Sequence, residues 1–75
     1  MVPRESVGAG PSPVRERRRQ LRFTQAELAD QVGVSRQTII SVERGDYAPS
    51  VYLAIRIARA LGGAVEELFT PEGEN

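Results

Sequence analysis

The sequence predicts an all-α fold, a compact bundle of five short helices in one small domain. Apolar residues recur at the three- and four-residue spacing of a helix, and no segment alternates apolar and polar residues as a strand does. Serine or threonine precedes four of these apolar stripes and glycine follows three of them, which is the usual order of helix start and stop signals. A chain of 75 residues has room for a single core.

The first helix is expected over residues 13–21, after a leader over residues 1–11 that holds proline and glycine without apolar periodicity. We expect this leader to be disordered. Ser12 is a typical N-cap, and Pro13 suits the first helical position because an N–H there would have no partner in the helix. Helical spacing gives this helix an inner face that includes an arginine and consists of Val14, Arg18 and Leu21.

The second helix has the clearest start signal in the chain. Thr24 and Glu27 have the spacing of a capping box, in which each side chain accepts a hydrogen bond from the other residue's amide. Phe23 and Leu28 stand at the flanking positions of a hydrophobic staple. Gly33 should end the helix, because glycine adopts the left-handed conformation without a Cβ clash. The inward side chains are expected to be Leu28, Ala29 and Val32.

The third helix should follow at once, capped by Ser35 and running to about Arg44, with Gly45 after it. Only Gly33 and Val34 separate it from the second helix, so the two helices must cross steeply, with Val34 filling the corner. This is the geometry of a helix-turn-helix, whose second helix can lie in a DNA major groove about 12 Å wide.

Two further helices complete the prediction. Ser50 should cap a fourth helix over residues 51–61, and Gly62-Gly63 should separate it from a fifth helix over about residues 64–69. The inward side chains are expected to be Leu53, Ala54, Ile57, Ala58, Leu61, Val65, Leu68 and Phe69. Tyr52 suits an exposed partner anchor or a half-buried core position, and we favour the core position. The candidate dimer surface consists of Val51, Tyr52, Ile55 and Phe69.

Composition argues against several function classes. The chain has no cysteine and no histidine, so it lacks thiol chemistry, the usual zinc ligands and the usual general base. We therefore expect no enzymatic activity, no catalytic residue, no metal and no cofactor. No apolar run reaches the roughly 18 residues of a membrane span. The net charge is zero, yet all ten basic residues are arginine, and six of them precede residue 23.

The outward surface of the third helix carries side chains that can contact base edges. It consists of Arg36, Gln37, Ile40, Ser41 and Arg44. Arginine pairs bidentately with guanine, glutamine pairs with adenine, serine bonds to either, and an apolar side chain touches a thymine methyl. The same residues also suit a plain solvated face, and composition alone favours neither interpretation.

Residues 24–39, TQAELADQVGVSRQTI, resemble the core of the Cro and phage-repressor type of helix-turn-helix domain, also called the Xre type. The resemblance covers about residues 13–69 and is strongest to minimal bacterial members that have little beyond this domain. It continues through Val42-Glu43-Arg44-Gly45, Pro49-Ser50, Ile57-Ala58, Ala60-Leu61-Gly62 and Glu66-Glu67-Leu68-Phe69. It implies a lambda-repressor-like DNA-binding domain over residues 12–70, followed by a short acidic tail over residues 71–75.

The resemblance also implies roles for individual residues. Base-reading positions follow the cap of the third helix and fall on Arg36, Gln37, Ile40 and Ser41. Phosphate contacts are implied for Gln25, Ser35, Thr38, Arg44, Arg22 and Tyr47. Related phage repressors pair the positions of Arg18 and Glu43, which implies a structural ion pair, since either charge buried alone would be strongly destabilising.

These features predict sequence-specific binding of double-stranded DNA by a bacterial transcriptional regulator that is cytoplasmic and associated with the nucleoid. One domain of this size reads only a few base pairs, so we expect a repressor that binds a palindromic operator as a homodimer. No small-molecule ligand and no membrane partner are expected. The alternative is an antitoxin-like or other protein-interaction module with a protein partner, in which DNA binding is secondary.

Overall fold

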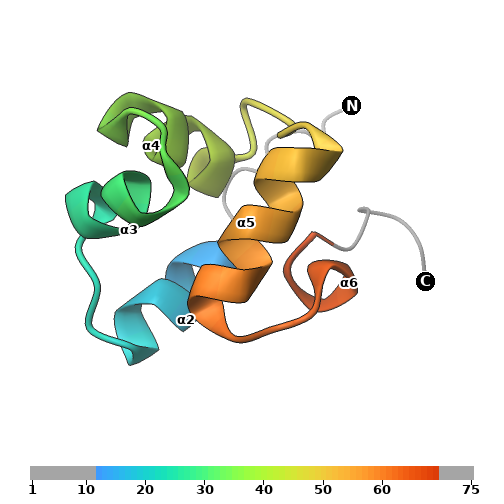
Figure 1. Cartoon of the computed structure of the whole chain (residues 1–75), viewed down its shortest axis with the longest axis horizontal. Helices are drawn as coiled ribbons and strands as arrows, with labels where there is room; N and C mark the ends of the chain where they lie inside the picture. The colour runs from blue at the N-terminus through green and yellow to red at the C-terminus, as the bar shows by residue number, and fades with distance from the viewer. Residues whose placement is uncertain (1–11, 70–75) are drawn as a thin grey trace.

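The computed structural model describes residues 12–69, which form five α-helices and no strand (Figure 1). The helices are α2 (Pro13–Gln20), α3 (Gln25–Val32), α4 (Arg36–Arg44), α5 (Val51–Leu61) and α6 (Val65–Leu68). The predicted all-α class and the order of five helices are confirmed. The expected leader, the expected acidic tail and Thr70 lie outside the described residues.

Side-chain caps fix four of the five helix starts. The hydroxyls of Ser12, Ser35 and Ser50 each accept a hydrogen bond from the amide three residues later, at 3.3, 3.2 and 3.1 Å. The capping box forms in full, because the Glu27 amide donates to Thr24 Oγ1 at 3.0 Å and the Thr24 amide donates to Glu27 Oε1 at 2.8 Å. Each cap satisfies an N–H group that the first turn leaves without a partner.

The core gathers around α5. In Figure 1, α5 runs between the α3–α4 pair on one side and α6 on the other. The largest fully buried side chains come from four helices and are Val14, Leu28, Ile39, Ile57 and Leu61. Leu68 of α6 is buried, and Phe69 packs against the core while partly exposed. One continuous apolar cluster therefore packs against the inner face of α4 and fixes its position.

The junction between α2 and α3 differs from the expectation. α2 ends at Gln20, so Leu21 lies beyond the last helical residue and is 44% exposed. Arg22 then adopts a φ of +63°, a left-handed conformation that costs a residue with a Cβ about 1 kcal/mol or more. The inward position predicted for Leu21 was wrong, because helical spacing ceases to apply where the helix has ended.

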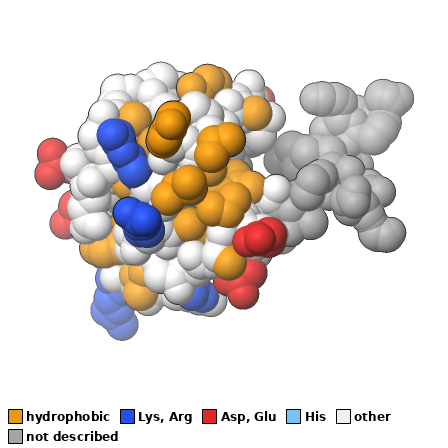
Figure 2. Space-filling model, turned by 45° about the vertical axis from the view of Figure 1, so that its right-hand side comes forward, with side chains coloured by type: hydrophobic (Ala, Val, Ile, Leu, Met, Phe, Trp, Pro, Cys, Tyr) orange, Lys and Arg blue, Asp and Glu red, His pale blue; other side chains and the backbone are white. Residues whose placement is uncertain are grey.

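The outer face of α5 also corrects a prediction. Tyr52 is 80% exposed and is not the half-buried core residue that we favoured. Val51 is 72% and Ile55 36% exposed, so three large apolar side chains of α5 face away from the core. Figure 2 shows hydrophobic side chains gathered on this side of the molecule, with basic side chains at one edge of the patch and acidic ones at another.

Candidate nucleic-acid interface

The turn between α3 and α4 sets the direction of α4. Gly33 takes a φ of +78°, the left-handed conformation at which an added Cβ would strain the backbone. The Val34 amide then donates to the Ala29 carbonyl at 3.0 Å, and the Val34 side chain packs against the core. Ser35 begins the next helix at once, so α3 and α4 form a helix-turn-helix with the two-residue corner that the sequence predicts.

A long-range contact that the sequence did not predict supports the same corner. Arg56 of α5 donates from Nη1 to the carbonyl of Val32, the last residue of α3, at 3.0 Å. The carbonyl groups of a helix's last turn have no partner within the helix, and a guanidinium satisfies one here. Sequence spacing gave no signal for this bond.

The four expected base-reading side chains share the outer side of α4. Ile39 and Val42 are buried at 0% and 7% exposure, which fixes the opposite face of the helix against the core. The outer set contains two exposed residues, Arg36 and Gln37, and two half-buried residues, Ile40 and Ser41. Because Arg36 and Gln37 are the first two residues of α4, their side chains lie at the end where an inserted helix meets base edges.

Hydroxyl groups cluster at the N-terminal end of α4. Ser35 Oγ accepts from the Thr38 amide and lies 3.0 Å from Thr38 Oγ1, so the two hydroxyls share a hydrogen bond. When one hydroxyl donates to the other, the second retains its own hydrogen for an outside acceptor. The pair can therefore cap α4 and donate to a phosphate at the same time.

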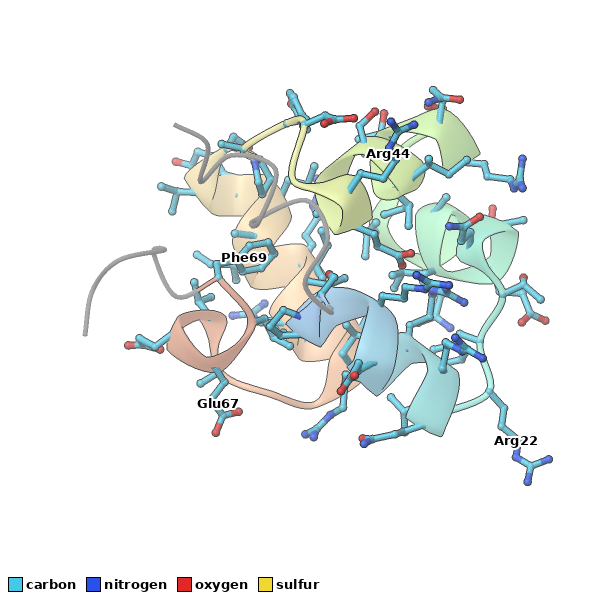
Figure 3. The ribbon with its side chains drawn as sticks, turned by 180° about the vertical axis from the view of Figure 1, so that it is seen from behind. Arg22, Arg44, Glu67 and Phe69 are labelled. Atoms are coloured by element: carbon cyan, nitrogen blue, oxygen red, sulfur yellow. The ribbon has the colours of Figure 1, made fainter. Side chains whose placement is uncertain are left out.

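Arg44 and Tyr47 lie at the other end of α4. The Arg44 side chain is 70% exposed, and its Nε lies 3.3 Å from Oδ2 of Asp46. Since both partners are well exposed, this ion pair is weak and can exchange for a phosphate. Tyr47 is 47% exposed in the loop that follows. Arg22 does not join them, because it points into solvent at the opposite end of the view in Figure 3.

Arg18 and Glu43 meet inside the domain. Arg18 Nε donates to Glu43 Oε2 at 2.6 Å, and Nη2 donates to Oε1 at 3.2 Å. Their side chains are only 10% and 3% exposed, so water solvates neither charge well and each depends on the other. Gln25, expected at a phosphate, also donates from Nε2 to Glu43 Oε1 at 3.1 Å. Sequence reasoning missed this third bond, because nothing local relates the first residue of α3 to the end of α4.

Two general features complete the description. Among residues 12–69, no helix is both long enough and apolar enough to cross a membrane. In the same residues, no three acidic, cysteine or histidine side chains come together in a way that could hold a metal ion.

Comparison with known proteins gives consistent matches. The family model described as Helix-turn-helix matches residues 14–68. An HTH-type transcriptional regulator of Methanothermobacter thermautotrophicus is 58% identical over 57 residues, covering 75% of this chain and 83% of its own. The regulator YgzD of Bacillus subtilis is 42% identical over 62 residues, covering 83% and 94%. The similar proteins thus come from archaea as well as bacteria.

Solved structures agree with these matches. The restriction-modification controller protein C.AhdI from Aeromonas hydrophila superposes with a TM-score of 0.71 at 33% identity, over 76% of this chain and 86% of its own. The clp gene regulator ClgR from Corynebacterium glutamicum also gives a TM-score of 0.71, at 32% identity, over 87% of this chain and 66% of its own. Both similarities extend over most of the described helices.

Proposed function

Since the chain belongs to the helix-turn-helix family of DNA-binding transcriptional regulators of the Cro/C1 (Xre) type, we propose that it is a dimeric repressor that reads an operator with α4. This family consists of regulators and not of enzymes. Repression would be steric, because a protein bound over promoter DNA blocks access to it. Relatives named as transcriptional regulators support the regulatory role, and the geometry of α4 supports the mode of binding.

The observation that carries the proposal is the two-sided character of α4. Its inner side is fixed by Ile39 and Val42, while Arg36 and Gln37 at its start are exposed. These two side chains offer the bidentate donors and acceptors that distinguish guanine and adenine in the major groove. Candidate phosphate ligands flank them: Ser35 and Thr38 at the start of α4, and Gln25 and Arg44 near its end. Such a layout anchors the helix to the DNA backbone at both ends and leaves the side chains at its start to meet the bases.

We assign the dimer contact to the outer face of α5, with a second copy of this chain as the occupant. Tyr52, Ile55 and Arg59 follow one another at three- and four-residue spacing, so they share that face. If two α5 helices cross antiparallel near Ile55 on a two-fold axis, Tyr52 of each copy lies opposite Arg59 of the other. A guanidinium stacks well on a tyrosine ring, which makes this face complementary to itself.

This contact also suits the DNA. Only the short loop of residues 45–50 separates the end of α4 from the start of α5. A two-fold axis beside α5 would therefore bring the C-terminal ends of the two α4 helices toward each other. A dimer with this symmetry would bind a palindromic operator, and we expect its half-sites to lie about one DNA turn, roughly 34 Å, apart.

Selection from a pool of randomised duplex DNA tests the proposal. At about 0.15 M salt, where exposed charges are largely screened, the wild-type protein should enrich a palindrome with half-sites one turn apart. The control is Arg36→Ala combined with Gln37→Ala, which should keep the fold, since both residues are exposed, and should lose the enrichment. Folded wild-type protein that enriches no sequence would overturn the proposal.

An antitoxin-like or other protein-interaction module is the second candidate. It is favoured by the 80% exposure of Tyr52, because exposed aromatic residues are common where proteins bind partners. In that case the outer face of α5 would bind a different protein, and the chain alone would stay monomeric. The mass of the purified chain in solution separates the two candidates.

A further inference from the structure

The carboxylate of Glu43 links the core of the domain to the surface. Glu43 accepts two hydrogen bonds from Arg18 and a third, on Oε1, from Nε2 of Gln25 at 3.1 Å. Arg18 is itself held by the Phe23 carbonyl, which accepts from Nη1 at 2.8 Å. The result is a continuous chain of bonds from the α2–α3 junction, through two buried charges, to a half-buried glutamine at the start of α3.

This chain fixes which end of the Gln25 amide faces inward. An ionised carboxylate can only accept hydrogen bonds, so the amide must turn its NH2 group toward Glu43. An NH2 group has two hydrogens, and the second remains for an acceptor outside the protein. The Glu43 side chain is only 3% exposed, so water competes little for this hydrogen bond.

We propose that Glu43 is a positioning residue for DNA binding, which holds the Gln25 amide so that its second N–H donates to a backbone phosphate. This inference rests on the proposed function. A phosphate oxygen also only accepts, so a freely rotating amide would present its carbonyl, the wrong group, part of the time. The backbone N–H groups of Gln25 and Ala26 lie at the same end of α3 and are not used by the capping box, which engages only the N–H groups of Thr24 and Glu27.

A purely structural bond would behave differently. Glu43 already pairs both of its oxygens with Arg18, so its charge is compensated without Gln25. If the bond served stability alone, removal of the Gln25 amide would change unfolding and leave DNA affinity unchanged. A positioning role predicts that the contribution of Gln25 to DNA affinity depends on the Glu43 carboxylate.

A double-mutant cycle measures that dependence. One background is the wild type, and the other is Arg18→Met with Glu43→Leu. The double substitution removes both buried charges together and fills their space with apolar side chains, so the domain should still fold. Gln25→Ala is made in each, and binding to a mixed-sequence duplex is followed by fluorescence anisotropy across a salt series. The matched control is Gln31→Ala, an exposed glutamine of the same helix.

We expect Gln25→Ala to weaken binding about tenfold in the wild type and about twofold in the charge-free background. The slope of log Kd against log salt should stay constant, because a neutral donor releases no counterion. Equal losses in the two backgrounds would overturn the inference, and so would a loss no larger than that of Gln31→Ala. If the wild type binds no duplex at all, the proposed function fails as well.

A second readout needs no DNA. In nuclear magnetic resonance spectra of the free wild type, one side-chain amide proton of Gln25 should exchange slowly with solvent, unlike those of Gln31. In the charge-free background the two glutamines should become alike. Fast exchange of both Gln25 protons in the folded wild type would contradict the inference directly.

Discussion

Arg17 of α2 donates from Nε to the carbonyl of Leu61, the last residue of α5, at 3.0 Å. Its Nη2 donates to the carbonyl of Gly62 at 3.0 Å, so one guanidinium closes the C-terminal end of the central helix. The two residues of the first bond stand 44 positions apart in the chain. The arginine-rich first helix is therefore divided by role, since Arg17 and Arg18 hold the fold while Arg15 and Arg19 remain exposed.

The first prediction compares two neighbouring arginines of α2. Arg17→Ala should lower the free energy of unfolding by about 1–2 kcal/mol, because two carbonyl groups at the end of α5 lose their donor. Arg19→Ala is the matched control, and it should stay within about 0.5 kcal/mol of the wild type because that side chain is exposed. Urea denaturation measures both. Equal effects of the two variants would contradict the assigned role.

The second prediction concerns the buried ion pair. Arg18→Met alone should cost about 3–5 kcal/mol, since it leaves the Glu43 carboxylate buried without its partner. Arg18→Met with Glu43→Leu should recover most of that loss, because no uncompensated charge remains. Thermal and urea unfolding of the three proteins test this. An unchanged melting temperature for Arg18→Met would refute the pair as a structural element.

Local signals in the sequence predicted the helix boundaries well. Thr24 with Glu27, and Gly33 at the corner, act on neighbouring residues, so their consequences can be derived from spacing alone. Leu21 and Tyr52 were misplaced for different reasons. At Leu21, helical periodicity was extended past the end of the helix. At Tyr52, the apolar character of the ring was given more weight than its position, which is out of phase with the inward residues of the helix.

Contacts between residues far apart in the chain could not be predicted from local sequence patterns. The hydrogen bonds from Gln25 to Glu43 and from Arg56 to Val32 depend on how α3, α4 and α5 pack, and no local pattern specifies that packing. The resemblance to phage repressors suggested one long-range pair, Arg18 with Glu43, because it carried information about a shared fold. The base-reading and phosphate roles stay predictions, and they rest on the exposure of those residues and on the family.

The third prediction separates strain from charge at Arg22. Its φ of +63° is unfavourable for arginine and free for glycine, so Arg22→Gly should preserve or raise the melting temperature. If Arg22 contacts a phosphate, the same variant should weaken binding to all duplexes and reduce the salt slope by about 0.9 per monomer. Arg15→Gly serves as a contrast, because glycine inside α2 should destabilise by about 1 kcal/mol. A melting temperature that falls equally in both variants would exclude strain at Arg22.

The fourth prediction addresses the outer face of α5. Tyr52→Lys should raise the dimer dissociation constant at least tenfold, because it sets a lysine against Arg59 of the second copy. The monomer should remain folded, since Tyr52 is 80% exposed. Adding Arg59→Glu to Tyr52→Lys should restore the dimer by an opposite-charge pair. Sedimentation equilibrium measures the dissociation constant of each protein, and a dimer unaffected by both variants must use another surface.

The fifth prediction distinguishes base recognition from backbone contact on α4. Arg36→Ala should cost about 1–3 kcal/mol on the selected operator and relax the preference at one base position of each half-site, because a bidentate contact to a base is lost. Arg44→Ala should instead weaken binding to all sequences alike and flatten the salt dependence, since a phosphate contact carries charge and no sequence information.

Two features of the structure sharpen this comparison. Arg36 begins α4 and Arg44 ends it, and both are exposed, so neither substitution should disturb the core. Arg44 also leaves an ion pair with Asp46 when it binds a phosphate, so Asp46→Asn should tighten binding to every duplex. Titrations of the operator and a scrambled duplex at several salt concentrations measure all three variants. Uniform loss in both arginine variants would mean that α4 touches DNA without reading it, and the base-reading role would then belong to another surface.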